Sequence, residues 1–389
     1  MKSQEILSDI TEVDLYRKLQ EHFDTFPVGY PSTKSGVEIR ILKQLFTTEE
    51  AKIALNLKFS HSFEDFEPLD SIHERLKSLG FPYTKDELEN HLDNLAKKGA
   101  IKTLKQYNQK TYSASLFMIG MFEYQVNKLT KEFAEDTQQY MDEVYIEEMG
   151  RTLPLQMRTI PVGVSVDHSV EIGNFDDITK LIESMEGPIV IQNCICRQAS
   201  HALGKSCLAT SRLETCMGFG SFAKMYIDLG WGREITKEEA IDILKRNEEE
   251  GLIFQPSNSQ KPDFICSCCG CCCEALRTLK QFPNPGGIVS TNYYAEIDPD
   301  LCTGCSTCIK RCHMEAITLK DDISSINKER CIGCGNCAYA CPSEAIEFLK
   351  KEQQFSPPST MAEYYDENLV ARTKRKEREL RKQARLKKK

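Results

Sequence analysis

Eight cysteines near the C-terminus form a tandem repeat, and this repeat constrains the fold more than any other feature of the chain. Each copy spaces four cysteines three, three and four residues apart, and the second copy follows 29 residues after the first. The same offset relates Gly304 to Gly333 and residues 315–317 to residues 344–346. Zinc sites use paired Cys-x-x-Cys segments and disulfide frameworks are typical of short secreted chains, so neither accounts for two runs of four.

The repeat resembles the two-cluster ferredoxins of bacteria. Thiolates three residues apart on a tight turn can surround one face of an Fe4S4 cube, whereas the fourth cysteine of each run crosses to the other cube. The resemblance therefore implies two [4Fe-4S] clusters with crossed ligands. Cluster one would take Cys302, Cys305, Cys308 and Cys341, and cluster two would take Cys331, Cys334, Cys337 and Cys312. Pro342 follows the last cysteine as in those ferredoxins, and His313 stands where the first run would have its proline.

Ten further cysteines lie upstream, and their spacing follows no standard rule. They are Cys194, Cys196, Cys207, Cys216, Cys266, Cys268, Cys269, Cys271, Cys272 and Cys273. We expect them to hold at least one additional iron–sulfur cluster, in which Cys196, Cys207 and Cys216 are joined by one cysteine of the late run, residues 266–273. Cys194 and further residues of the late run could hold another. A zinc site, and a mixture of ligands with buried free thiols, remain open.

The N-terminal part has the order helix, turn, helix and hairpin, which resembles a winged helix. The expected elements are a helix capped at Thr47, a helix over 71–79, a helix capped at Thr84 and ended by Gly99, and strands over 101–107 and 111–117. The third helix carries Asp86, Glu87, Glu89 and Asp93, whereas phosphate contacts need a basic face. The acids therefore argue against DNA binding and favour a structural or protein-binding role.

The middle of the chain predicts a small α/β unit that presents the upstream cysteines. An amphipathic helix is expected from Phe122 to Tyr145. After it come a strand over 158–166, a helix over 175–185 capped by Asn174, a strand over 189–191 that leads to Cys194, a helix over 236–250 and a strand over 252–255. The fold class is thus α+β and multidomain. The expected division is 1–121 winged-helix-like, 122–150 connecting helix, 151–290 cysteine-rich α/β domain, 291–350 dicluster ferredoxin fold, and 351–389 basic tail.

Composition places the chain among reduced, water-soluble proteins. It has 389 residues and 18 cysteines, no apolar leader-like segment near Met1, and no apolar run long enough to span a membrane, so we expect a cytoplasmic protein whose thiols serve metals. Residues 372–389 carry eleven Lys or Arg against two Glu, a net +9, which leaves −17 on the remainder. This basic tail is expected either to be a solvated end or to dock on an acidic partner, RNA or an anionic membrane surface.

Residues 40–348 as a whole resemble multidomain 4Fe-4S dicluster proteins of anaerobic bacteria and archaea. These proteins combine a winged-helix-like N-terminus, Cys-x-Cys-Arg and Cys-Cys-Gly-Cys-Cys segments, and a C-terminal ferredoxin module. The resemblance implies electron transfer. Because the sequence has no glycine-rich dinucleotide or nucleotide motif, electrons would enter and leave through redox protein partners. The leading hypothesis is a carrier or electron-transfer subunit. A redox-sensing winged-helix regulator, and a reductase whose active site is an upstream cluster, remain open; no catalytic residue is identified.

Overall fold

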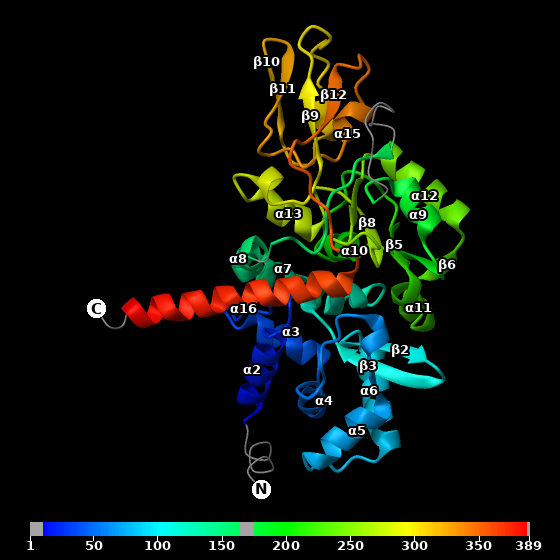
Figure 1. Cartoon of the computed structure of the whole chain (residues 1–389), viewed down its shortest axis with the longest axis vertical. Coiled ribbons are helices and arrows are strands. Elements are labelled where there is room, and N and C mark those ends of the chain that lie inside the picture. Colours follow the sequence, from blue (N-terminus) through cyan, green and yellow to red (C-terminus); the bar gives the residue numbers. More distant parts are fainter. Residues whose placement is uncertain (1–10, 152, 164–174, 387–389) are drawn as a thin grey trace. The chain divides into compact units, whose positions relative to one another are not determined.

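A computed structural model describes residues 11–151, 153–163 and 175–386 of the chain. The chain separates into two compact units that both mix helices and sheets (Figure 1). The first unit comprises Met1–Leu153 together with Ala362–Lys389, and the second comprises Pro154–Met361. The C-terminal segment, expected as a separate tail, thus belongs to the same unit as the N-terminal part.

The first unit begins with helices that precede and flank a small antiparallel sheet. The helices are α2 (Glu12–Phe23), α3 (Val37–Leu45), α4 (Thr48–Ala54), α5 (Leu69–Ser78) and α6 (Lys85–Lys98), and the strands are β1 (Glu67–Pro68), β2 (Ile101–Gln106) and β3 (Gln109–Ala114) in the order β1-β3-β2. Thr47 and Thr84 form capping boxes with Glu50 and Glu87, as the sequence predicts. Gly99 ends α6 with a φ of 79°, a conformation that favours glycine.

The connecting helix predicted over 122–145 is broken in the structure. A short turn, η3 (Glu123–Gln125), is followed by Asn127 with a φ of 65°, which no continuous helix can accommodate. The helix begins anew as α7 (Lys131–Tyr140), because the Thr130 hydroxyl accepts a hydrogen bond from the amide of Phe133. It then continues through the wider turn η4 (Met141–Tyr145) into α8 (Ile146–Arg151).

The C-terminal helix α16 (Met361–Leu386) is anchored in the first unit by ion pairs. The guanidinium of Arg372 is buried and contacts the carboxylates of Asp24 at 2.5 Å and Glu148 at 3.0 Å. Arg375 also reaches Glu148, and Lys376 also reaches Asp24. The prediction of a solvated end is therefore wrong for Arg372, Arg375 and Lys376, whose charges are partnered within the unit.

The second unit is built on an antiparallel sheet with the strand order β6-β4-β5-β8-β7. Its strands are β4 (Ile189–Asn193), β5 (Glu214–Phe219), β6 (Arg233–Ile235), β7 (Ile253–Pro256) and β8 (Phe264–Cys268), and the neighbouring helices are α9 (Ile178–Ser184), α10 (Ile195–Ala202), α11 (Gly220–Asp228), α12 (Lys237–Glu249) and α13 (Glu274–Lys280). The fully buried Ile182, Ile191 and Ile265 form a core between one sheet face and helices α9 and α12. This leaves the opposite face of β5 and β8 available for cysteines.

Two predictions for the start of this unit need correction. The described part of the segment predicted as a strand over 158–166 forms one isolated bridge, Ile160 with Phe254, and the preceding Met157 forms another with Ser257. The predicted helix cap Asn174 and residues 164–166 lie outside the described residues. Helix α9 begins at Ile178 rather than at residue 175, because the Asp177 carboxylate accepts the first free amides.

The cysteine repeat folds into two paired halves. Strand β9 (Tyr293–Ile297) pairs with β12 (Ile346–Lys350), and β10 (Ile317–Lys320) pairs with β11 (Ile323–Ile326). The short helices α14 (Thr307–Arg311) and α15 (Asn336–Tyr339) occupy equivalent places in the two copies of the repeat, 29 residues apart. Position 304 needs a glycine, because its φ is 68° and a Cβ there would lie 2.6 Å from the carbonyl oxygen of Asp322.

Candidate metal centres

Two cavities in the repeat region are each lined by four cysteines. One is lined by Cys302, Cys305, Cys308 and Cys341. The other is lined by Cys312, Cys331, Cys334 and Cys337. Each cavity takes three cysteines from one run and the fourth from the other run. These are the two sets that the sequence predicts, and the crossed ligand assignment stays a prediction that the cavities support.

The two cavities differ in their exposure to solvent. Cys305 is exposed at the first cavity, whereas Cys337 is buried at the second. Burial raises the pKa of the Cys334 thiol to about 12. At the first cavity, the backbone amide of Ser324 donates a hydrogen bond to Cys302 Sγ and lowers the pKa of that thiol. The first cavity is therefore the one with a cysteine exposed to solvent, although its Cys308 is buried.

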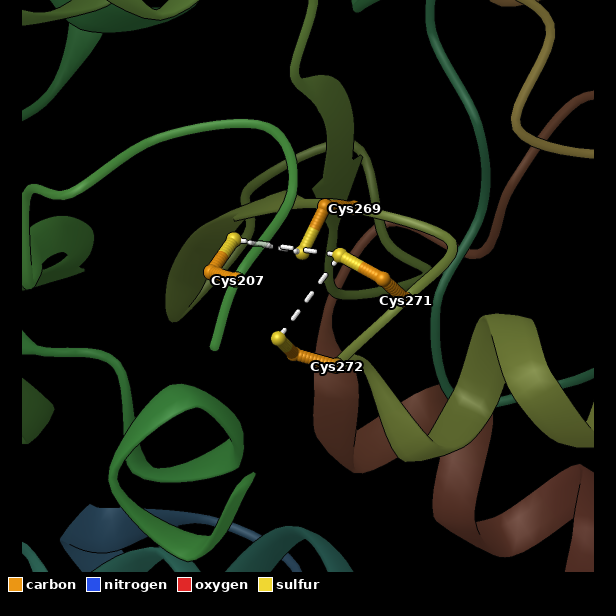
Figure 2. Close-up of side chains that lie close together, drawn as sticks. All are labelled: Cys207, Cys269, Cys271 and Cys272. Atoms are coloured by element: carbon orange, nitrogen blue, oxygen red, sulfur yellow. Dashed lines mark hydrogen bonds between the residues drawn. The ribbon is translucent and has the colours of Figure 1, made fainter. Parts of the chain in front are cut away.

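Four upstream cysteines converge on a single point, which we call the four-cysteine site (Figure 2). They are Cys207, Cys269, Cys271 and Cys272, whose sulfurs all lie within 4.8 Å of one another. Cys207 Sγ lies 3.6 Å from Cys269 Sγ and 3.8 Å from Cys271 Sγ, and Cys271 Sγ lies 3.7 Å from Cys272 Sγ. A tetrahedral ion bound to four thiolates at ~2.3 Å requires sulfur–sulfur distances of about 3.8 Å. The four-cysteine site thus has the geometry of a tetrahedral thiolate site.

The turn between β8 and α13 supplies three of these four ligands. The chain leaves the sheet after Cys268 and reverses at Gly270, so that Cys269, Cys271 and Cys272 point toward the loop that carries Cys207 (Figure 2). The amide of Leu208 donates a hydrogen bond of 3.4 Å to Cys271 Sγ. The pKa of Cys271 is lowered, chiefly because the neighbouring thiols of Cys269 and Cys272 donate hydrogen bonds to it. These contacts stabilise thiolate character, which metal binding requires.

The other six upstream cysteines form a separate ring, which we call the six-cysteine ring. Each thiol shifts the pKa of its neighbours in the order Cys194, Cys196, Cys273, Cys268, Cys266, Cys216 and back to Cys194, so the six side chains lie next to one another in this order. Cys216 and Cys266 are direct partners across strands β5 and β8. Two accepted hydrogen bonds lower the pKa of Cys266 to about 6, whereas the pKa values of Cys216 and Cys268, its neighbours in the ring, are raised.

The buried Arg197 contributes positive charge to both cysteine groups. Its guanidinium donates hydrogen bonds to the carbonyl of Ser267, at 3.1 Å, and to the hydroxyl of Thr215. Burial opposes the charged form, but attraction to the sulfurs of Cys194 and Cys269 outweighs it and raises the pKa of Arg197. Cys194 belongs to the six-cysteine ring and Cys269 to the four-cysteine site. One guanidinium therefore offsets the negative charge of both groups.

His313 joins the repeat region to the four-cysteine site. Its Nδ1 accepts a hydrogen bond of 3.2 Å from the amide of Gly270, and its Nε2 donates one of 2.8 Å to the carbonyl of Gly251. Burial lowers the pKa of His313, so the ring is neutral and suits this pair of partners. A Cβ on Gly270 would lie 2.6 Å from the His313 carbonyl, so glycine is needed there. The sequence showed His313 only as a departure from the usual proline, and nothing in the spacing indicated its partner.

The structure groups the upstream cysteines differently from the expectation. It places Cys207 in the four-cysteine site, whereas Cys196 and Cys216 belong to the six-cysteine ring. The late run divides equally between the groups. Cys266, Cys268 and Cys273 belong to the ring, and Cys269, Cys271 and Cys272 belong to the four-cysteine site. Adjacent cysteines at 268 and 269 point to different sites because the strand ends between them.

Comparison with known families identifies one part of the chain. Residues 294–354 match the model of the 4Fe-4S dicluster domain family. Both cysteine-lined cavities of the repeat region fall within this dicluster domain, so the chain carries a ferredoxin-type iron–sulfur domain near its C-terminus. Searches among curated proteins and among solved structures found no match. No helix within the described ranges is both long and apolar enough to cross a membrane.

Proposed function

We propose that this protein is an iron–sulfur electron-transfer protein that passes single electrons between protein partners, as a carrier or as a subunit of a redox complex. The observation that carries the proposal is the pair of cysteine-lined cavities in the dicluster domain, one of which has a ligand at the surface. Each cavity would hold one [4Fe-4S] cluster, and such clusters change their charge by one electron. Cytoplasmic location and an anaerobic setting belong to the same proposal.

The contacts favour a direction for the electron path. An external partner would exchange electrons at the cavity with the exposed Cys305, and the second cavity would connect onward through Cys312 and His313. His313 contacts the turn that holds Cys269 and Cys271, so the four-cysteine site is the next metal centre on this path. The path requires iron in that site, because zinc has no redox chemistry.

For the first unit we propose a winged-helix-like module that binds protein rather than DNA. Its hairpin and helix α6 share their charges internally, since Lys110 Nζ lies 2.8 Å from Glu89 and 2.6 Å from Asp93. A lysine neutralised in this way contributes little to phosphate binding. Beyond the anchored residues of α16, the exposed Arg385 would attract an acidic partner, together with the exposed Arg381, whose surface ion pair with Glu377 is 3.8 Å long.

The experiment is a reductive titration of the full chain purified without oxygen. Visible absorbance should bleach in one-electron steps, and the fully reduced protein should give the EPR spectrum of two interacting clusters. The variant Cys207→Ser is the matched control, since it alters the four-cysteine site and should leave the EPR signals of the dicluster domain unchanged. Absorbance that does not respond to reduction, or EPR from a single isolated cluster, would contradict the proposal.

A further inference from the structure

The six-cysteine ring is held by rigid elements on one side of the sheet. Cys216 and Cys266 are cross-strand partners, and Cys268 lies two residues further along β8, so all three side chains share a face. This face is opposite to the core face, on which Ser267 accepts a hydrogen bond from Asn247 of α12. The remaining members come from segments that start helices: Cys194 is the N-cap of α10, and Cys273 is the N-cap of α13.

The ring is too open for one tetrahedral ion. No three of its sulfurs lie within 4.8 Å of one another, and all six residues belong to the described part of the chain. In the four-cysteine site, by contrast, all four sulfurs lie within 4.8 Å of one another. A single tetrahedral metal uses four thiolates, so it would leave two of the six sulfurs without a metal in a buried setting. An open ring of six thiolates instead fits a core that contains several metal atoms.

Two polar side chains, Arg197 and Gln255, also lie next to the ring. The buried Arg197 lies beside Cys194 and Cys216 and is 1 % exposed. A buried cation is costly unless anions surround it. The side-chain oxygen of Gln255, the cross-strand neighbour of Cys266, accepts a weak hydrogen bond of 3.9 Å from Cys273 Sγ.

We propose that Cys194, Cys196, Cys216, Cys266, Cys268 and Cys273 hold one polynuclear metal centre, separate from the four-cysteine site and from the dicluster domain. Thiolates select iron–sulfur clusters and zinc among the common metals, so the centre is either an iron–sulfur cluster or a thiolate-bridged zinc pair. The cluster and the zinc pair both place two or more metal atoms within the ring. The proposal is independent of electron transfer, since a zinc pair would leave the dicluster domain functional.

The test is a count of metal and sulfide in the full chain and its variants, purified without oxygen. The double variant Cys194→Ser/Cys273→Ser replaces two ring sulfurs at positions where serine is a favourable helix cap, so the helices should be retained. It should lose at least two metal atoms per chain. Loss of iron together with sulfide identifies a cluster, and loss of zinc identifies a zinc pair. A loss of one metal atom or none would overturn the proposal.

The matched control is Cys272→Ser, which lies beside Cys273 but belongs to the four-cysteine site. Its metal loss should add to that of the double variant when all three substitutions are combined. If Cys272→Ser alone removes the same metal as the double variant, the two groups form one composite site and the proposal fails. Retained EPR signals of the dicluster domain show that each variant is folded. If the double variant is not folded, Cys216→Ala/Cys266→Ala provides the same count from the strand side of the ring.

Discussion

The amide of Gly270 donates a hydrogen bond of 3.2 Å to Nδ1 of His313, and this contact joins the dicluster domain to the upstream cysteines. Gly270 separates Cys269 from Cys271 in the four-cysteine site, and His313 directly follows Cys312 of the second cavity. The second ring nitrogen of His313 is held by the carbonyl of Gly251. A neutral imidazole with one donor and one acceptor satisfies both partners, so the two cysteine-bearing turns are fixed to each other.

Replacing His313 should loosen this connection. His313→Ala leaves the buried Gly270 amide without this partner, whereas the Gly251 carbonyl keeps the hydrogen bond from the Asn336 side chain. The unpaired amide should cost about 1–3 kcal/mol and speed the loss of metal from the four-cysteine site. The measurement is the rate of metal transfer from the full chain to a chelator. His201→Ala, an exposed histidine on α10, is the control. Equal rates for both variants would show that the contact has no such role.

Crossed ligation in the dicluster domain should appear as damage across the repeat. Cys312 ends the first run but lines the second cavity, and Cys341 ends the second run but lines the first cavity. The variants to compare are Cys312→Ala and Cys341→Ala. EPR of each reduced variant should show loss of the cluster in the opposite half. Damage confined to the cluster of the same run would make the crossed assignment wrong.

Removing the buried charge at Arg197 should weaken metal retention at both upstream groups. Arg197→Met keeps the length of the side chain but leaves the thiolates of Cys194 and Cys269 without their nearby cation. We expect the full chain to lose at least half of its upstream metal, by count after gel filtration. Arg233→Gln is the control, because Arg233 forms a surface ion pair with Glu214 that contributes about 1 kcal/mol or less. Unchanged metal content in Arg197→Met would contradict the assigned role.

The anchoring of α16 predicts a large loss of folding stability when Arg372, a residue of the basic tail, is replaced. Arg372→Met should destabilise the first unit by about 3 kcal/mol, the lower end for a broken buried ion pair, because Arg375 and Lys376 still reach Glu148 and Asp24. Urea unfolding followed by circular dichroism measures the change. Arg381→Gln, whose side chain is exposed, should change stability by no more than about 0.5 kcal/mol. Similar values for both variants would place the anchor elsewhere.

The full chain should not bind DNA tightly. Asp86 and Glu87 of helix α6 are exposed to solvent, and Lys110 of the hairpin is paired with Glu89 and Asp93. A fluorescence-polarisation titration with a random duplex at moderate salt is the measurement. Submicromolar affinity that falls steeply with salt would contradict this prediction and favour the regulator hypothesis.

The local elements were predictable where short-range chemistry determines them. The caps at Thr47 and Thr84, the stop at Gly99 and the hairpin after it follow from residues within a few positions of each other. The repeat was predictable for a similar reason, since its spacing determines which sulfurs can share a cavity. Breaks such as the one at Asn127 were not, because a single residue with positive φ interrupts an otherwise helical pattern.

The grouping of the upstream cysteines could not be predicted from spacing. Cys207 is 62 residues from Cys269, and only the path of the sheet brings them together. The separation of Cys268 from Cys269 depends on where β8 ends, and strand ends are set by pairing with β7 and β5. The buried position of Arg197 likewise depends on the fold, although its place beside Cys196 was visible in the sequence.

Mössbauer spectroscopy of the ⁵⁷Fe-enriched full chain, before and after stepwise reduction, tests the central claim most directly. The account predicts iron beyond the about eight atoms of two [4Fe-4S] clusters, with upstream iron that changes its oxidation state after the dicluster domain is reduced. About eight iron atoms per chain, accompanied by zinc in the upstream groups, would contradict the proposed electron path and end it at the dicluster domain.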